Sequence, residues 1–75
     1  MTRDALITWA TRNGWKLDRW GHLKKEFDNG KHRIKLSRIA ARHEISTPFG
    51  WARLASGYLK NLSITPDDKI AGMTR

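Results

Sequence analysis

The chain has 75 residues, of which 15 are Lys or Arg and seven are Asp or Glu, so its formal net charge is +8. This length is that of one small domain, residues 1–75, with a thin core, and the absence of cysteine excludes disulfides, thiolate metal ligands and a cysteine nucleophile. No apolar run approaches the roughly 18 residues of a membrane span, and the first residues show no signal-peptide pattern. We therefore expect a cytoplasmic protein without a membrane partner, located in the host cytoplasm if a phage encodes it.

The first predicted element is a helix over residues 3–12. Thr2 is a suitable N-cap, and Leu6 and Trp9 recur at the spacing of one helix face. The Asn-Gly pair at positions 13–14 predicts the end of the helix. Ten residues are too few for a stable isolated helix, so this face must pack against the rest of the chain.

After the helix, turn signals recur every eight to ten residues, which is typical of a meander of short antiparallel strands. The strongest signal is the Asn-Gly pair at 29–30, the favoured pair of a type I′ hairpin turn. A two-residue loop there predicts one charged face and one mainly apolar face. The expected cross-strand pairs are Asp28–Lys31, Glu26–Arg33 and Lys24–Lys35 on the charged face, and Phe27–His32, Lys25–Ile34 and Leu23–Leu36 on the other.

The second half of the chain predicts further strands. The alternation of apolar residues changes parity near residues 37–38, which indicates a bulge or tight turn before a strand at about 39–46. Residues 48–62 fit a helical stripe, but two glycines weaken a helix and the Ser-Gly pair at 56–57 is a turn signal, so we favour strands. A last hairpin is expected around residues 66–68. The predicted fold is α+β, an N-terminal helix followed by an antiparallel β-meander, with helix–three strands–helix as the alternative.

A basic hairpin carries the main functional signal. Lys31, Arg33 and Lys35 alternate along one strand and project from one face about 7 Å apart, and such cations neutralise the phosphates of a nucleic-acid strand. The plainer interpretation is a solvated sheet face, in which Glu26 and Asp28 pair with two of these Lys and Arg side chains. The charge excess favours nucleic acid. The predicted phosphate contacts are Lys24, Lys31, Arg33, Lys35, Arg38 and Arg42.

Aromatic residues supply a second candidate feature. Trp15, Trp20 and Tyr58 have rings that can stack on unpaired bases. In a small domain most aromatic side chains belong to the core. Trp20 is the best binding candidate because it precedes Gly21 in a predicted turn.

The three histidines give little evidence of catalysis. His22, His32 and His43 have no metal-ligand spacing, and the chain contains no phosphate loop, nucleophile elbow or paired-carboxylate motif. We therefore expect neither a metal site nor a cofactor. His22, in a predicted turn, is the one weak candidate for a catalytic residue.

The order of helix, Gly14-Trp15, Arg19, Gly21-His22 and basic hairpin over residues 5–37 resembles the HicA family of small RNA-cleaving toxins. The resemblance implies a double-stranded-RNA-binding-like fold of helix, three strands and helix, and a catalytic histidine in a Gly-Ser-His motif. In this chain the corresponding segment is Trp20-Gly21-His22, without the serine. The second helix of that family would correspond to residues 48–62.

Three functions follow from these observations. The first is a non-enzymatic protein that contacts the backbone of DNA or RNA. The second is an RNA-cleaving enzyme with His22 as general acid or base. The third is an inhibitor of the phage type, which occupies an anionic or nucleic-acid-binding site on another protein. Small basic accessory proteins of phages and other mobile elements match the chain in size and charge. DNA or RNA preference, sequence specificity and oligomeric state remain open, and the interpretation requires the cations to lie on one exposed face.

Overall fold

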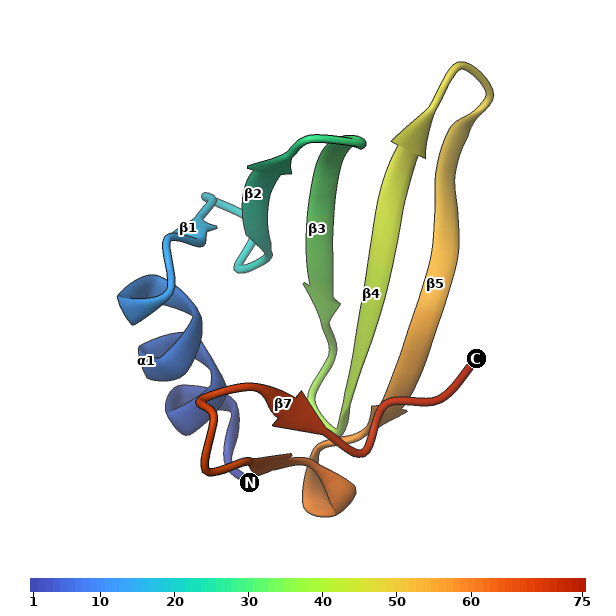
Figure 1. Ribbon diagram of the computed structural model, residues 1–75. Helices are drawn as coiled ribbons and strands as arrows, with labels where there is room; N and C mark the ends of the chain where they lie inside the picture. Colours follow the sequence, from blue (N-terminus) through green and yellow to red (C-terminus); the bar gives the residue numbers. More distant parts are fainter.

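A helix and a curled antiparallel sheet share one core in this protein, whose computed structural model describes residues 1–75 (Figure 1). The elements in chain order are α1 (Arg3–Arg12), β1 (Lys16–Leu17), β2 (Leu23–Phe27), β3 (Gly30–Leu36), β4 (Ala40–Thr47), β5 (Gly50–Tyr58), the 3-10 turn η1 (Leu59–Asn61), β6 (Ser63–Ile64) and β7 (Ile70–Ala71). The main sheet has the order β1-β2-β3-β4-β5, and β6 pairs with β7 alone. The predicted α+β fold, an N-terminal helix followed by an antiparallel meander, is confirmed.

Helix α1 forms where the sequence predicts it. The Thr2 hydroxyl accepts a hydrogen bond from the Ala5 N–H at 3.1 Å and so caps the first turn. Leu6 and Ala10 are completely buried. Their burial supplies the tertiary packing that a ten-residue helix needs.

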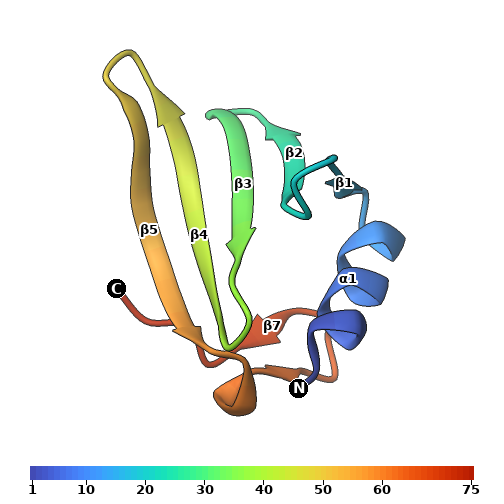
Figure 2. The same ribbon diagram turned by 180° about the vertical axis from the view of Figure 1, so that it is seen from behind.

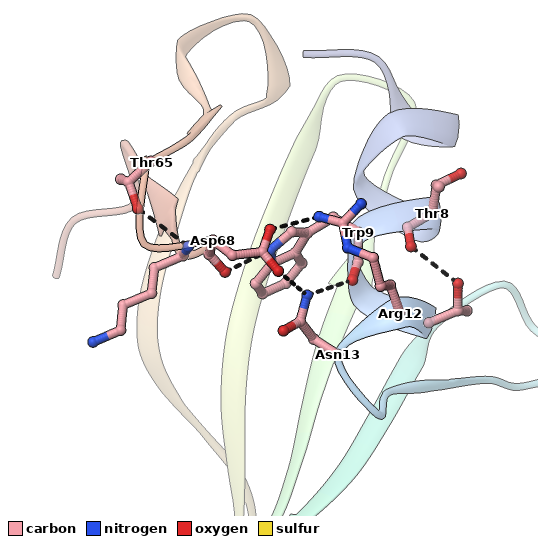
Figure 3. A network of polar contacts seen from close by, with 8 residues as sticks. Thr8, Trp9, Arg12, Asn13, Thr65 and Asp68 are labelled. Carbon is pink, nitrogen blue, oxygen red and sulfur yellow. Dashed lines mark hydrogen bonds and ion pairs between the residues drawn. The ribbon is translucent and has the colours of Figure 1, made fainter.

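The turn between β6 and β7 is attached to the last turn of α1 by a polar network around Asp68 (Figure 3). The Trp9 indole N–H donates to the Asp68 carbonyl at 2.9 Å. The Asp68 carboxylate accepts from Arg12 at 2.5 Å and from Asn13 at 3.1 Å. The Asn13 hydrogen bond is the main reason that the pKa of Asp68 lies below its ordinary value, with Arg12 adding to it. These bonds hold the β6–β7 turn against α1, on the core side of the curled sheet.

The predicted register of the β2–β3 hairpin is wrong by two residues. Phe27 pairs with Gly30, so the loop is Asp28-Asn29 and Leu23 faces Ile34. A type I′ turn needs positive φ at both central residues, but here only Gly30, after the turn, has positive φ, at 124°. Because a shift by two residues preserves side-chain parity, the division of this hairpin into a charged and an apolar face is unchanged.

Residues 48–62 form a strand and a 3-10 turn, so the alternative fold with a second α-helix is wrong. The turn signal at Ser56–Gly57 is also wrong, because β5 continues through it. A Cβ at position 57 would lie 2.7 Å from the Gly72 carbonyl oxygen. Gly57 therefore permits the close approach of the C-terminal segment, which pairs with β5 through two backbone hydrogen bonds between Ser56 and Thr74.

The core lies between α1, the inner face of the sheet and the C-terminal segment. Figure 2 shows that α1 and β7 lie beside the lower part of the sheet, whereas the tip of the β4–β5 hairpin extends above them. Every buried residue in the strands of the main sheet except Glu44 points to this inner face. The buried apolar residues are Leu6, Ala10, Trp15, Leu23, Ile34, Leu36, Ala41, Leu59 and Leu62.

Two histidines form a polar chain inside the upper core. His32 Nε2 lies 2.8 Å from Asn29 Oδ1, and His32 Nδ1 lies 2.8 Å from His43 Nε2. Since the amide oxygen accepts, His32 carries its proton on Nε2 and accepts the His43 N–H. Trp15 and Phe27 pack edge-on or tilted against these rings. Desolvation lowers the pKa of His32, and desolvation together with the neighbouring His32 lowers the pKa of His43.

This pair predicts that the fold loses stability in mild acid. The pKa values of both rings are lower in the folded protein than the ordinary value of 6.5. In the pH window between the folded and the ordinary values, the unfolded chain therefore binds more protons than the folded protein. The free energy of unfolding is therefore at its full value above about pH 6.5 and decreases as the pH falls through that window. Denaturant unfolding between pH 7.5 and pH 5 measures this decrease, and NMR titration of the ring protons assigns it.

The lowered carboxyl pKa values act in a separate range, because Asp18 and Asp68 have an ordinary value of 3.8. Their contribution to stability is present above about pH 3.8 and is lost only at lower pH. A flat stability profile from pH 7.5 to pH 5, or titration of both rings at or above pH 6.5, would contradict the prediction.

Candidate nucleic-acid interface

The antiparallel register places alternate side chains of β1–β5 on the face of the sheet opposite the core, which we call the outer face. Its charged members are Lys16, Lys24, Glu26, Lys31, Arg33, Lys35, Arg42, Glu44 and Arg53. Seven basic side chains (Lys or Arg) therefore share this face with two acidic ones. Because side chains alternate with a period of two along each strand, the pairing of the strands itself gathers these charges.

Five of the six predicted phosphate contacts lie on the outer face. Arg38 is the exception, since it lies in the exposed turn between β3 and β4. Arg53 was not predicted. A register shift between His43 and Glu44 leaves Leu54 as an extra residue in β5, and this β-bulge turns Arg53 to the outer face. The alternation of Trp51 and Arg53 was the available sequence signal, but Leu54 interrupts it.

Glu44 organises the centre of the outer face. Its side chain is only 6% exposed, although it lies on the face away from the core. The Arg33 Nε–H donates to Glu44 Oε1 at 2.6 Å, and Arg42 Nη1 lies 3.8 Å from Oε2. The Arg33 guanidinium also lies 4.3 Å from the ring centroid of Trp51. The carboxylate thus holds two of the predicted contacts in place and balances part of their charge.

Of the other predicted contacts and Arg53, only Lys24 lies close to a carboxylate. Lys24 lies 3.4 Å from Asp18 Oδ2. Lys31, Lys35, Arg38 and Arg53 form no ion pair, and all four are exposed. Carboxylate pairing therefore leaves a positive surface that is open to solvent.

A hollow of about 690 Å³ lies at the end of the outer face nearest the C-terminal segment. Lys35 and Arg42, which are direct cross-strand partners, contribute its cations. Ser56, Tyr58 and Thr74 contribute hydroxyl groups. Two cations beside several hydroxyl donors are a suitable set of partners for phosphate oxygens.

The loop between β1 and β2 is organised by Asp18. Its Oδ1 accepts the N–H groups of Trp20 and His22, both at 2.9 Å. The His22 N–H is the main cause of the lowered pKa of Asp18, and the Trp20 N–H and Lys24 lower it further, against an opposing effect of desolvation. This arrangement fixes the position of Trp20 relative to the outer face.

The three aromatic candidates have different surroundings. Trp15 belongs to the core, whereas Trp20 is 64% exposed and Tyr58 is 55% exposed. The Arg19 guanidinium lies 4.5 Å from the Trp20 ring centroid, and Lys24 Nζ lies 5.7 Å from it. Trp20 therefore lies among cations, as a residue that stacks on bases beside phosphates would.

His22, the catalytic candidate, has a structural hydrogen bond. Its Nδ1 accepts the Leu36 N–H at 3.1 Å, which joins the β1–β2 loop to the end of β3. His32 and His43 are engaged in the inner core. No group of three or more His, Asp or Glu side chains has an arrangement that would hold a metal ion.

Comparisons with known proteins found no matching family model, no similar curated protein and no similar solved structure. The resemblance to HicA toxins therefore stays a prediction. None of the helices combines the length and the apolar composition that crossing a membrane requires.

The Glu44 cluster predicts a stability difference between two acids of the same face. Glu44→Gln removes the charge that holds Arg33, and the free energy of unfolding should decrease by about 1.5–3 kcal/mol, as for hydrogen bonds to charged groups. Glu26→Gln is the matched control, because Glu26 is exposed and forms no ion pair. We expect that variant to stay within about 0.5 kcal/mol of the wild type in urea unfolding. Equal effects of the two substitutions would contradict this role of Glu44.

Proposed function

We propose that this protein binds nucleic acid, DNA or RNA, by contacting phosphates through the outer face of its sheet. The observation that carries the proposal is the cross-strand register, which places seven Lys or Arg side chains and only two Glu side chains on one face. A surface of this kind attracts a polyanion and releases its counterions on binding.

The chemistry of the face favours backbone contact over the reading of base sequence. Its charged groups are mainly Lys and Arg, spaced along strands as phosphates are spaced along a chain. The hollow with Lys35 and Arg42 provides one defined place for a phosphate. We propose binding that depends weakly on sequence, and we propose the cytoplasm as its location.

Binding without cleavage is the form of the function that the geometry supports best. A general acid or base needs a ring nitrogen that is free to exchange a proton with substrate. Because His22 Nδ1 accepts the Leu36 N–H, the ring proton of His22 lies on Nε2, and Nε2 then has no lone pair with which to act as a general base. The other two histidines lie on the inner face. We therefore propose an accessory protein rather than an RNA-cleaving toxin.

This proposal predicts a change in the salt dependence of binding. Lys31→Gln together with Lys35→Gln removes two unpaired cations of the outer face, so affinity for an oligonucleotide should decrease. The log-log slope of affinity against salt should become shallower by about 1.4–1.8 for two lost phosphate contacts. Fluorescence anisotropy at a series of salt concentrations, with single- and double-stranded 20-mers, measures both quantities.

Lys60→Gln together with Lys69→Gln is the matched control, since these two lysines lie in η1 and before β7, outside the outer face. It removes the same charge and should leave the slope within about 0.3 of the wild type. Equal slopes for the two double variants would show a diffuse charge effect and would overturn the assigned face. A wild-type protein that binds neither oligonucleotide at low salt would instead favour a protein partner.

A further inference from the structure

The tip of the β4–β5 hairpin presents a phenylalanine to solvent. Phe49 is 99% exposed, more than any other large apolar side chain in the protein. In Figures 1 and 2 this hairpin extends past the β2–β3 hairpin and ends away from α1 and β7. The ring therefore stands at the end of a projecting arm and contributes nothing to the core.

The backbone that carries Phe49 is well ordered by its own hydrogen bonds. The Thr47 hydroxyl accepts the Phe49 N–H at 3.2 Å and donates to the Gly50 carbonyl at 2.7 Å. Pro48 restricts φ in the turn, and Gly50 has φ of 115°, which closes the turn at little steric cost. Because this backbone is already ordered, a ligand that covers the ring does not have to order the turn as well.

The tip adjoins the outer face along β5, and the two differ in chemistry. Residues 45–52 carry no charge, whereas Arg53, the next residue along β5, belongs to the outer face. Arg53 follows Phe49 by four residue steps, about 13 Å at the rise of a strand. This distance corresponds to about four base steps of a duplex at 3.4 Å each.

Nucleic acid presents the same two kinds of chemistry, charged phosphates on the outside and apolar base faces within. Aromatic side chains stack on unpaired bases, and apolar side chains enter between base pairs from projecting segments. An uncharged aromatic tip beside a cationic face is complementary to both parts. An anionic membrane fits less well, because the cations lie along the sheet rather than around the tip.

We propose that the Phe49 ring stacks on a nucleobase of the nucleic acid that the outer face holds, an inference that rests on the proposed function. The base contact is a π-face contact in either of two settings, an unpaired base in a single strand or an opened step in a duplex. It adds a contact with bases to an interface that otherwise contacts phosphates.

The test compares Phe49→Ala and Phe49→Trp with the wild type on three probes: a single-stranded 20-mer, a duplex 20-mer and inorganic polyphosphate. Polyphosphate has the charge of a nucleic acid but no bases. We expect Phe49→Ala to weaken binding to at least one oligonucleotide by about 5- to 150-fold, the range of one base–aromatic stack, with affinity for polyphosphate unchanged. Phe49→Trp should retain the affinity. Energy transfer between end labels on the duplex reports bending, and a bend that Phe49→Ala abolishes assigns the contact to an opened duplex step.

The failure of this inference is distinguishable from failure of the proposed function. If the wild type binds the oligonucleotides and Phe49→Ala binds all three probes equally well, stacking is overturned and phosphate binding stands. Equal loss on oligonucleotide and polyphosphate also overturns stacking. Vesicles of phosphatidylglycerol and phosphatidylcholine serve as a fourth probe, and a loss of binding confined to them would assign Phe49 to a membrane contact and overturn stacking. A wild type that binds no oligonucleotide overturns both. Because Phe49 is exposed, its variants should unfold at the wild-type denaturant midpoint, which confirms that they are folded.

Discussion

The antiparallel register of the main sheet is the constraint on which the rest of the molecule depends. Strand pairing with a period of two sends Leu23, Ile34 and Ala41 to one side and Lys24, Arg33 and Arg42 to the other. The same pairing therefore builds the core and the cationic outer face together. A register shift by an odd number of residues would bury the cations and expose the core, so the two features stand or fall together.

Two buried or partly buried carboxylates stabilise this small fold against the repulsion between its many cations. Glu44 lies beneath Arg33 and Arg42 and relieves part of their mutual repulsion. Asp68 attaches the C-terminal turn to α1, where the helix alone would leave one side of the sheet uncovered. These carboxylates keep charged side chains in fixed places, while the net charge of the outer face stays strongly positive.

The surface divides into a charged region and an apolar one. The strands carry the cations and the hollow near Lys35 and Arg42, and the β4–β5 tip carries Phe49. Trp20 lies in the β1–β2 loop, at the opposite edge of the sheet from β5, and its ring is close to Arg19 and Lys24. Nucleic acid is the partner whose own chemistry combines charge and aromatic faces in this way, which is why both proposals converge on it.

Local patterns in the sequence determined the helix, the antiparallel meander that follows it and the two faces of the β2–β3 hairpin, because capping, periodicity and turn residues act over a few positions. The register of the β2–β3 hairpin was decided only in the folded sheet, where Phe27 pairs with Gly30 and β3 also pairs with β4 along its other edge. The bulge that turns Arg53 outward, the burial of Glu44 and the bond from Leu36 to His22 are likewise tertiary. Each joins residues on different strands or loops, whose distance and orientation a linear pattern does not contain.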